Sequence, residues 1–140
     1  MAVVSRAMAI YHISPDEHGE THLRRVELPV VETSVGRVGT TGEIPTDRVS
    51  IAEFIDCRKP DQGLHPAPRR QFVGVLRGVM EIETSLGTTQ RFYPGDFMIA
   101  DDVVSKGHHT RDVGDVPLGM MTVGLPADWG LPADWVVPGS

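Results

Sequence analysis

Short runs in which apolar and polar residues alternate occupy most of the chain, and turn-forming residues separate them. MAIYHIS, at residues 8–14, alternates and is rich in strand-forming residues, and PDEHGE at 15–20 then breaks the run. This period of two is typical of a strand half buried on a sheet. The same pattern predicts strands at 21–28, 48–55, 70–76, 79–84, 89–93, 97–101, 108–113 and 117–125. No segment keeps a helical period for the 10 to 12 residues or so that a clear helix needs.

Gly- and Pro-containing segments separate these predicted strands. Residues 33–48 predict a loop with short extended pieces, and DCRKPDQG at 56–63 predicts a turn. Many short strands with such turns indicate an all-β domain, either a sandwich or a barrel. We assign this domain to residues 1–124. Residues 125–140, in which LPADW occurs twice, predict an extended tail whose two Trp side chains pack either on the barrel or on a partner subunit.

Composition and charge narrow the function classes. The chain has 140 residues and a net charge of -6 without a basic tract, which argues against nucleic-acid or acidic-membrane partners. No apolar run approaches the roughly 18 residues of a membrane span. The first residues lack the features of a signal peptide, so we expect a cytoplasmic protein. Cys57 is the only cysteine, which excludes an internal disulfide and a zinc site built on paired cysteines.

Residues 63–78, GLHPAPRRQFVGVLRG, resemble the first motif of the cupins, in which a His-x-His pair, a Glu and a Gly recur at fixed spacing. His65 matches the first His and Gly78 matches the Gly. Ala67 stands at the second His and Gln71 at the Glu, while Gly63 lies too close to match the leading Gly. This chain therefore resembles a cupin whose metal motif has lost two of its ligands.

The second cupin motif is matched by Pro94-Gly95-Asp96 at a corner and by Lys106-Gly107-His108. HPAPRRQF, PGD and KGHHTR together resemble a set of small bacterial single-domain cupins. The resemblance implies an antiparallel jelly-roll β-barrel in which the two motifs converge on one pocket.

Alternation along the first-motif strand puts Arg69, Gln71, Val73 and Val75 on one face. His65 would lie at the mouth of the pocket, and the resemblance brings His108 to the same place. The expected site therefore consists of His65, Arg69, Gln71 and His108 around an apolar pocket, an arrangement typical of small-molecule sites. The remaining histidines are expected to be exposed: His12, His18, His22 and His109.

Three functions fit this site. The first is a metal-free enzyme of the lyase, isomerase or cyclase type, in which His65 or His108 moves a proton while Arg69 and Gln71 polarise a carbonyl. Small cupins that act on polyketide-like chains make that substrate class a candidate. The second is an oxygenase or hydrolase with Fe, Zn or Mn held by His65, Gln71 and His108. The third is a non-catalytic domain that binds a small acidic metabolite.

Two acidic residues and the N-terminal strand give two further expectations. Asp101 and Asp102 could add ligands to a metal site, but their position after the strand at 97–101 favours a solvated loop. An N-terminal strand with a free edge tends to pair with another chain. We therefore expect a homodimer, with residues 8–14 and the Trp-containing tail as candidate contacts.

Overall fold

The computed structural model describes residues 8–55 and 63–139, and nearly all regular structure in these ranges is β-strand. The strands are β1 Ile10–Pro15, β2 Thr21–Arg25, β3 Val30–Thr33, β4 Gly36–Gly39, β5 Val49–Glu53, β6 Gln71–Arg77, β7 Met80–Thr84, β8 Thr89–Phe92, β9 Phe97–Ala100, β10 His108–Asp112 and β11 Gly119–Gly124. A short 3₁₀ helix covers Ala133–Trp135. The predicted all-β class is confirmed. The described ranges contain no helix that is long and apolar enough to span a membrane.

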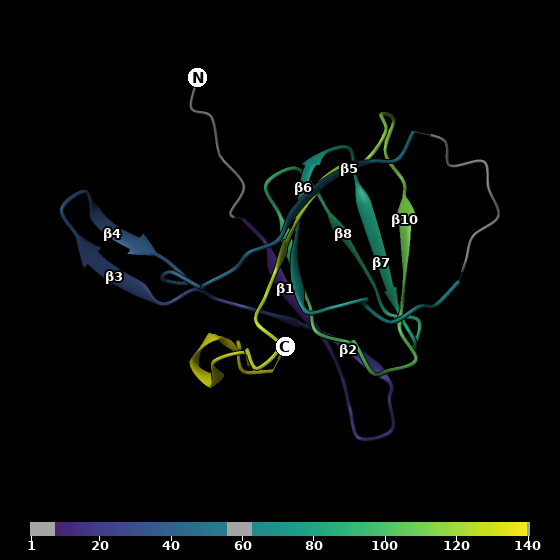
Figure 1. The fold of residues 1–140 in the computed structure, drawn as a ribbon, viewed down its shortest axis with the longest axis horizontal. Helices are drawn as coiled ribbons and strands as arrows, with labels where there is room; N and C mark the ends of the chain where they lie inside the picture. Colours follow the sequence, from purple (N-terminus) through teal and green to yellow (C-terminus); the bar gives the residue numbers. More distant parts are fainter. Residues whose placement is uncertain (1–7, 56–62, 140) are drawn as a thin grey trace.

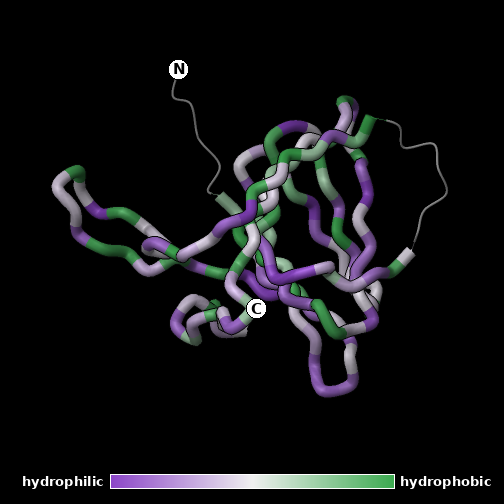
Figure 2. The backbone as a smooth tube through the Cα atoms, viewed as in Figure 1, coloured by the Kyte–Doolittle hydropathy of each residue, from purple (hydrophilic) through white to green (hydrophobic). Residues whose placement is uncertain are grey.

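Each predicted strand is present within a few residues of its predicted ends. Residues 33–48, which were predicted to be mostly loop, contribute to a two-stranded hairpin formed by β3 and β4. This hairpin projects away from the rest of the chain, and hydrophobic and hydrophilic residues are interspersed along it (Figures 1 and 2). The turn predicted at 56–63 lies outside the described residues except for Gly63, and Cys57 lies outside them too.

The larger sheet has six strands in the order β2-β1-β9-β6-β11-β5, and a second sheet has three in the order β10-β7-β8 (Figure 1). Neighbouring strands are antiparallel except β1 and β9, which run parallel, so the expectation of a purely antiparallel arrangement is wrong for this pair. Because β1 is hydrogen-bonded on both sides, it offers no free edge to a second chain. The homodimer remains a prediction, but β1 does not supply the contact expected of it.

The main core lies between the two sheets. Alternation places one set of side chains from each strand in this layer, as predicted for Val73 and Val75 of β6. Its buried members are Ile13, Ala67, Val73, Val75, Met80, Ile82, Phe92, Met98, Ala100, Leu118 and Met120. Because these residues come from both sheets, burial of their apolar surface holds the sheets together.

A second core covers the outer face of the six-stranded sheet. Trp135 is 5% exposed and packs with Ile10, Val26 and Ile99. Backbone contacts fix this arrangement, since Val26 bridges Val136 and the Glu27 N–H donates to the Trp135 carbonyl at 2.8 Å. The tail therefore folds back on the sheet instead of extending as an arm. Of the two packings predicted for the tail Trp side chains, Trp135 has the one against its own chain, not the one against a partner subunit.

Candidate functional site

A cavity of about 750 Å³ opens between the two sheets. Its walls come from β6, β9 and β11 on one side and from β7 and β10 on the other. The apolar side chains among its walls include Phe54, Val73, Met80, Met98 and Met120. The uncharged polar and imidazole side chains are His65, Gln71, His108, His109, Thr110 and Thr122. Three charged residues also line it: Glu53, Arg111 and Asp112. A space of this size that combines apolar side chains with polar groups suits a small organic molecule.

The chemically most distinctive feature of the cavity is a histidine paired with a buried carboxylate. The His108 Nδ1 lies 2.6 Å from the Asp102 Oδ2, and Asp102 is 0% exposed while His108 is 5% exposed. A carboxylate only accepts hydrogen bonds, so Nδ1 carries the proton and the Nε2 of a neutral ring keeps its lone pair. His108 is therefore oriented as a proton acceptor.

The prediction that Asp102 lies in a solvated loop is wrong. It lies two residues after the end of β9, a strand buried on both faces, and it is itself fully buried, so the chain is still inside the fold at this position. Its Oδ1 has no hydrogen-bond partner among the described residues. A fully buried carboxylate with one unused oxygen is costly for stability. The sequence signal for this pair is an acidic residue two positions after an apolar strand and six positions before the motif residue His108.

His65 is held beside His108 by the backbone. The two residues form an antiparallel bridge, with N–H to carbonyl distances of 2.9 and 3.0 Å, and their ring centroids are 5.2 Å apart. Gly107 makes this approach possible, because a Cβ there would lie 2.2 Å from the His65 carbonyl carbon. The His65 Nδ1 is 3.2 Å from the Gly63 carbonyl, which can only accept, so this nitrogen also carries the proton.

Gln71 begins β6 and lies opposite Ala100 of β9. It lines the cavity together with Val73, which shares its face of the strand, and with Ala67, which is buried. Its side-chain amide can donate to a carbonyl oxygen of a bound molecule. The structure thus brings His65, Gln71 and His108 around one space.

Arg69 does not line this cavity, so the prediction that places it in the pocket is wrong. β6 starts only at Gln71, so the alternation that predicts the shared face does not extend back to Arg69. Residues 68–70 form a bend, and the arginine lines a separate groove on the outside of the fold. Gln71 is therefore the residue of this segment that can polarise a carbonyl in the cavity.

The donor set fits a metal ion poorly. His65 and His108 offer one imidazole nitrogen each, and the third expected ligand, Gln71, is a neutral amide. Fe, Zn and Mn sites are commonly built from three or more His, Cys, Asp or Glu side chains. Over residues 8–55 and 63–139, no cluster of three or more such side chains is arranged to hold an ion. The carboxylate of Asp102 already binds the far nitrogen of His108.

A second histidine–carboxylate pair lies outside the cavity, where Arg70 contacts the tail. The His12 Nε2 donates to the Asp101 Oδ2 at 3.0 Å, and the Arg70 Nε donates to Oδ1 at 2.5 Å. Arg70 also donates to the carbonyl of Ala127 in the tail. His12 is 6% exposed, so its predicted exposure is wrong, because β1 lies inside the sheet and not at its edge. This network ties β1, β6 and the tail together.

Acid is expected to weaken this network. Burial alone would raise the pKa of Asp101, but the hydrogen bonds from His12 and Arg70 outweigh it and hold the pKa below its usual 3.8. A carboxyl with a lowered pKa stabilises the fold above that value, and the stabilisation is lost as pH falls through the folded-state pKa. As the pH falls below about 4, the Asp101→Asn variant should therefore lose less of its free energy of unfolding than the wild type does, measured by urea unfolding. Asp115→Asn, at an exposed loop position, is the control, and equal slopes for the two variants would contradict the assignment.

The other predicted surface histidines divide between exposed and buried positions. His18 is exposed, as predicted, whereas His22 is half-buried beside Asp16, with 2.8 Å between its Nε2 and the carboxylate. His109 is 7% exposed and lies 3.8 Å from Glu83, a residue that also pairs with Arg111. Because His109 is buried and is among the residues that line the cavity, the prediction that it is a surface residue is wrong.

Comparisons with known proteins add no family to this description. The chain matches no protein-family model, and a search of curated proteins finds no significant match. The geometry of the cavity and its Asp102–His108 pair therefore provide the basis for a functional proposal.

Proposed function

We propose that this protein is a cupin-like enzyme with a jelly-roll core that moves protons on small, largely apolar carbonyl compounds. The reaction would be of the lyase, isomerase or cyclase type, and polyketide-like chains are the substrate class we favour. The observation that carries this proposal is the Asp102–His108 pair, which presents an oriented imidazole to an apolar cavity. The two facing sheets, and the backbone bridge that joins the two motif positions, support the jelly-roll assignment.

The proposed chemistry begins with removal of a proton from the carbon next to a carbonyl group. The Nε2 of His108 accepts this proton, and the electron pair of the broken C–H bond moves onto the carbonyl oxygen as an enolate. The side-chain N–H of Gln71 donates a hydrogen bond to that oxygen. Asp102 stabilises the imidazolium that forms, because its carboxylate holds the Nδ1 proton.

The proton then returns to complete the reaction. Delivery to a different carbon gives an isomer, and delivery to a leaving hydroxyl group gives elimination of water. Attack of the enolate carbon on a second carbonyl of the same chain closes a ring, and the proton then goes to the new alkoxide. His65, at the rim of the cavity with its own Nε2 available, is placed to pass protons between the cavity and solvent. Each outcome needs only the groups described.

The test uses hydrogen–deuterium exchange, because exchange reports the first step without knowledge of the natural substrate. The protein is incubated in D₂O with methyl alkyl ketones of increasing chain length, and loss of the α-proton is followed by NMR. We expect exchange above the buffer rate that increases with chain length as more of the apolar lining is covered. Ketones that bind without any exchange would contradict an enzyme and support the non-catalytic binding domain.

A metal-dependent enzyme is the second candidate, because metal-bound histidines commonly have their other ring nitrogen held by a carboxylate, as His108 has. His65, Gln71 and His108 would be the ligands. Treatment with a chelator separates the two candidates, and the metal-free proposal expects exchange to continue unchanged. Exchange that stops on chelation and returns with added Fe, Zn or Mn would replace the first proposal by the second.

A further inference from the structure

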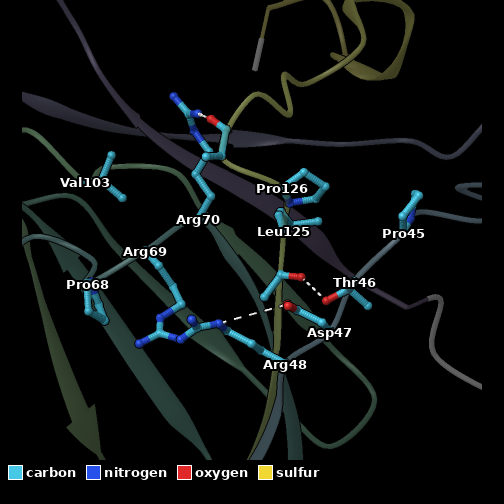
Figure 3. A pocket seen from close by; sticks show the side chains of 12 residues that line it. Pro45, Thr46, Asp47, Arg48, Pro68, Arg69, Arg70, Val103, Leu125 and Pro126 are labelled. Carbon is cyan, nitrogen blue, oxygen red and sulfur yellow. Dashed lines mark hydrogen bonds and ion pairs between the residues drawn. The ribbon is translucent and has the colours of Figure 1, made fainter.

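A groove of about 850 Å³ lies on the outside of the fold, separate from the cavity between the sheets. Three segments at strand ends form most of it: residues 45–48 before β5, residues 68–70 before β6, and residues 124–127, which begin with the last residue of β11. Val103, in the loop after β9, completes the wall. Figure 3 shows Arg69, Arg70 and Arg48 around this space, with Leu125 and Pro126 between them and Pro45.

The three arginines of the groove differ in how their charge is balanced. Arg70 is neutralised by Asp101 and donates to Ala127. Within the described residues, the Arg48 side chain pairs only with Asp47, at 4.0 Å, and both side chains are largely exposed, so this pair contributes little. Arg69 has no ion pair or hydrogen bond among the described residues. Two guanidinium groups thus face the groove with their charge mostly uncompensated.

The backbone places these two guanidinium groups on opposite walls of one space. Arg69 directly follows Pro68, whose ring restricts the backbone. Arg48 accepts a backbone hydrogen bond from Gly124 at 2.9 Å, and a Cβ on Gly124 would be only 3.1 Å from the Arg48 Cβ. The glycine thus lets the Arg48 stem lie close against the strand end. In Figure 3 the ends of the Arg48 and Arg69 side chains extend toward one another.

Like charges that converge in this way repel each other, and a bound anion would relieve that repulsion. Guanidinium groups match carboxylates in particular, since each can donate two parallel hydrogen bonds to the two oxygens. Apart from Thr46, Asp47 and Gly124, the remaining lining is apolar: Pro45, Pro68, Val103, Leu125, Pro126 and Ala127. The groove therefore combines a cationic end with an apolar surface.

We propose that this groove is a second binding site, for a small molecule that carries a carboxylate on an apolar body. Arg48 and Arg69 bind the carboxylate, and Val103, Leu125 and Pro126 contact the body. This site does not depend on the proposed chemistry of the cavity. The two spaces share the wall at Pro68, which lines both, so a molecule bound in the groove lies beside the cavity without occupying it.

The test measures binding of octanoate to the whole protein by calorimetry, with octanol and inorganic phosphate as comparison probes. We expect octanoate to bind, octanol to bind at least about tenfold more weakly for want of a charge, and phosphate to bind more weakly for want of an apolar body. The Arg48→Gln, Arg69→Gln double variant should lose at least about tenfold in octanoate affinity. Affinity of the wild-type protein should also fall as salt concentration rises.

Two controls make the location specific. Arg24→Gln removes an exposed arginine from β2, at the opposite edge of the six-stranded sheet, and should leave octanoate binding unchanged. His108→Gln alters the cavity and should also leave it unchanged, which separates this site from the proposed enzyme function. Octanoate binding that survives the double arginine variant, or that is lost in His108→Gln, would overturn the proposal. Stronger binding of phosphate than of octanoate would contradict the apolar half of the site.

Discussion

Replacement of Gly107 by alanine is expected to lower the free energy of unfolding by about 4 kcal/mol or more. A Cβ at this position would lie 2.2 Å from the His65 carbonyl carbon, 2.5 Å from its oxygen and 2.6 Å from the Pro66 nitrogen. All three are backbone atoms, so no side chain can turn aside to make room. The glycine also has φ +86°, a conformation that alanine adopts only with strain.

Gly87→Ala is a matched control for this experiment. Gly87 has φ +85°, but a Cβ there would meet nothing within 4 Å. The control therefore measures the backbone strain alone, about 1 to 2 kcal/mol, and the difference between the variants measures the crowding against His65. Urea unfolding of both variants gives the comparison. Equal losses would show that the His65 backbone can move away, and that its approach to His108 is not fixed by Gly107.

His108→Gln is expected to reduce the proposed exchange of ketone α-protons by about 10²- to 10⁴-fold, the usual contribution of a general base. Glutamine keeps a polar side chain of similar length but has no basic nitrogen. The variant should keep the far-ultraviolet circular dichroism spectrum of the wild type, because the β10 backbone pairing with β7 does not need the ring. His18→Gln, at an exposed turn position, is the control and should exchange at the wild-type rate.

Asp102→Asn tests the pairing itself. An asparagine amide can donate to the His108 Nδ1, which would favour the tautomer with its proton on Nε2 and leave no lone pair facing the cavity. Exchange should then fall at least about tenfold, although the imidazole is still present. The Nδ1 and Nε2 chemical shifts report the tautomer directly. Full activity with an altered tautomer would remove His108 from the base role.

Local patterns predicted the strands well because each pattern reflects which face of a strand is buried. In β6, Val73 and Val75 face the inner core while Phe72 packs on the outer one, and a period of two in the sequence is enough to predict that. Such a pattern contains no information about which strands become neighbours. The parallel pairing of β1 with β9 could therefore not be foreseen, nor could the burial of His12 that follows from it.

The errors around the site have a related origin. The prediction for Arg69 extends the alternation of β6 back beyond Gln71, where that strand begins, into the bend at residues 68–70. Asp102 is predicted to be solvated because acidic residues between strands usually lie in loops, whereas the structure buries its side chain against the His108 Nδ1. The positions of both side chains depend on tertiary packing, which local propensity and periodicity do not describe.

The pairing of β1 also has a consequence for folding during synthesis on the ribosome. β2 emerges soon after β1, but β9, the other neighbour of β1, follows more than 80 residues after it. The second core, on the outer face of the sheet, can form only later still, because Trp135 packs on Ile10 and Val26. Until then the nascent chain carries an unpaired β1 edge and an uncovered apolar sheet face, both of which favour aggregation. Folding should accordingly be slow for a chain of this size, and its yield should depend on chaperones that shield the first strands while later ones are made.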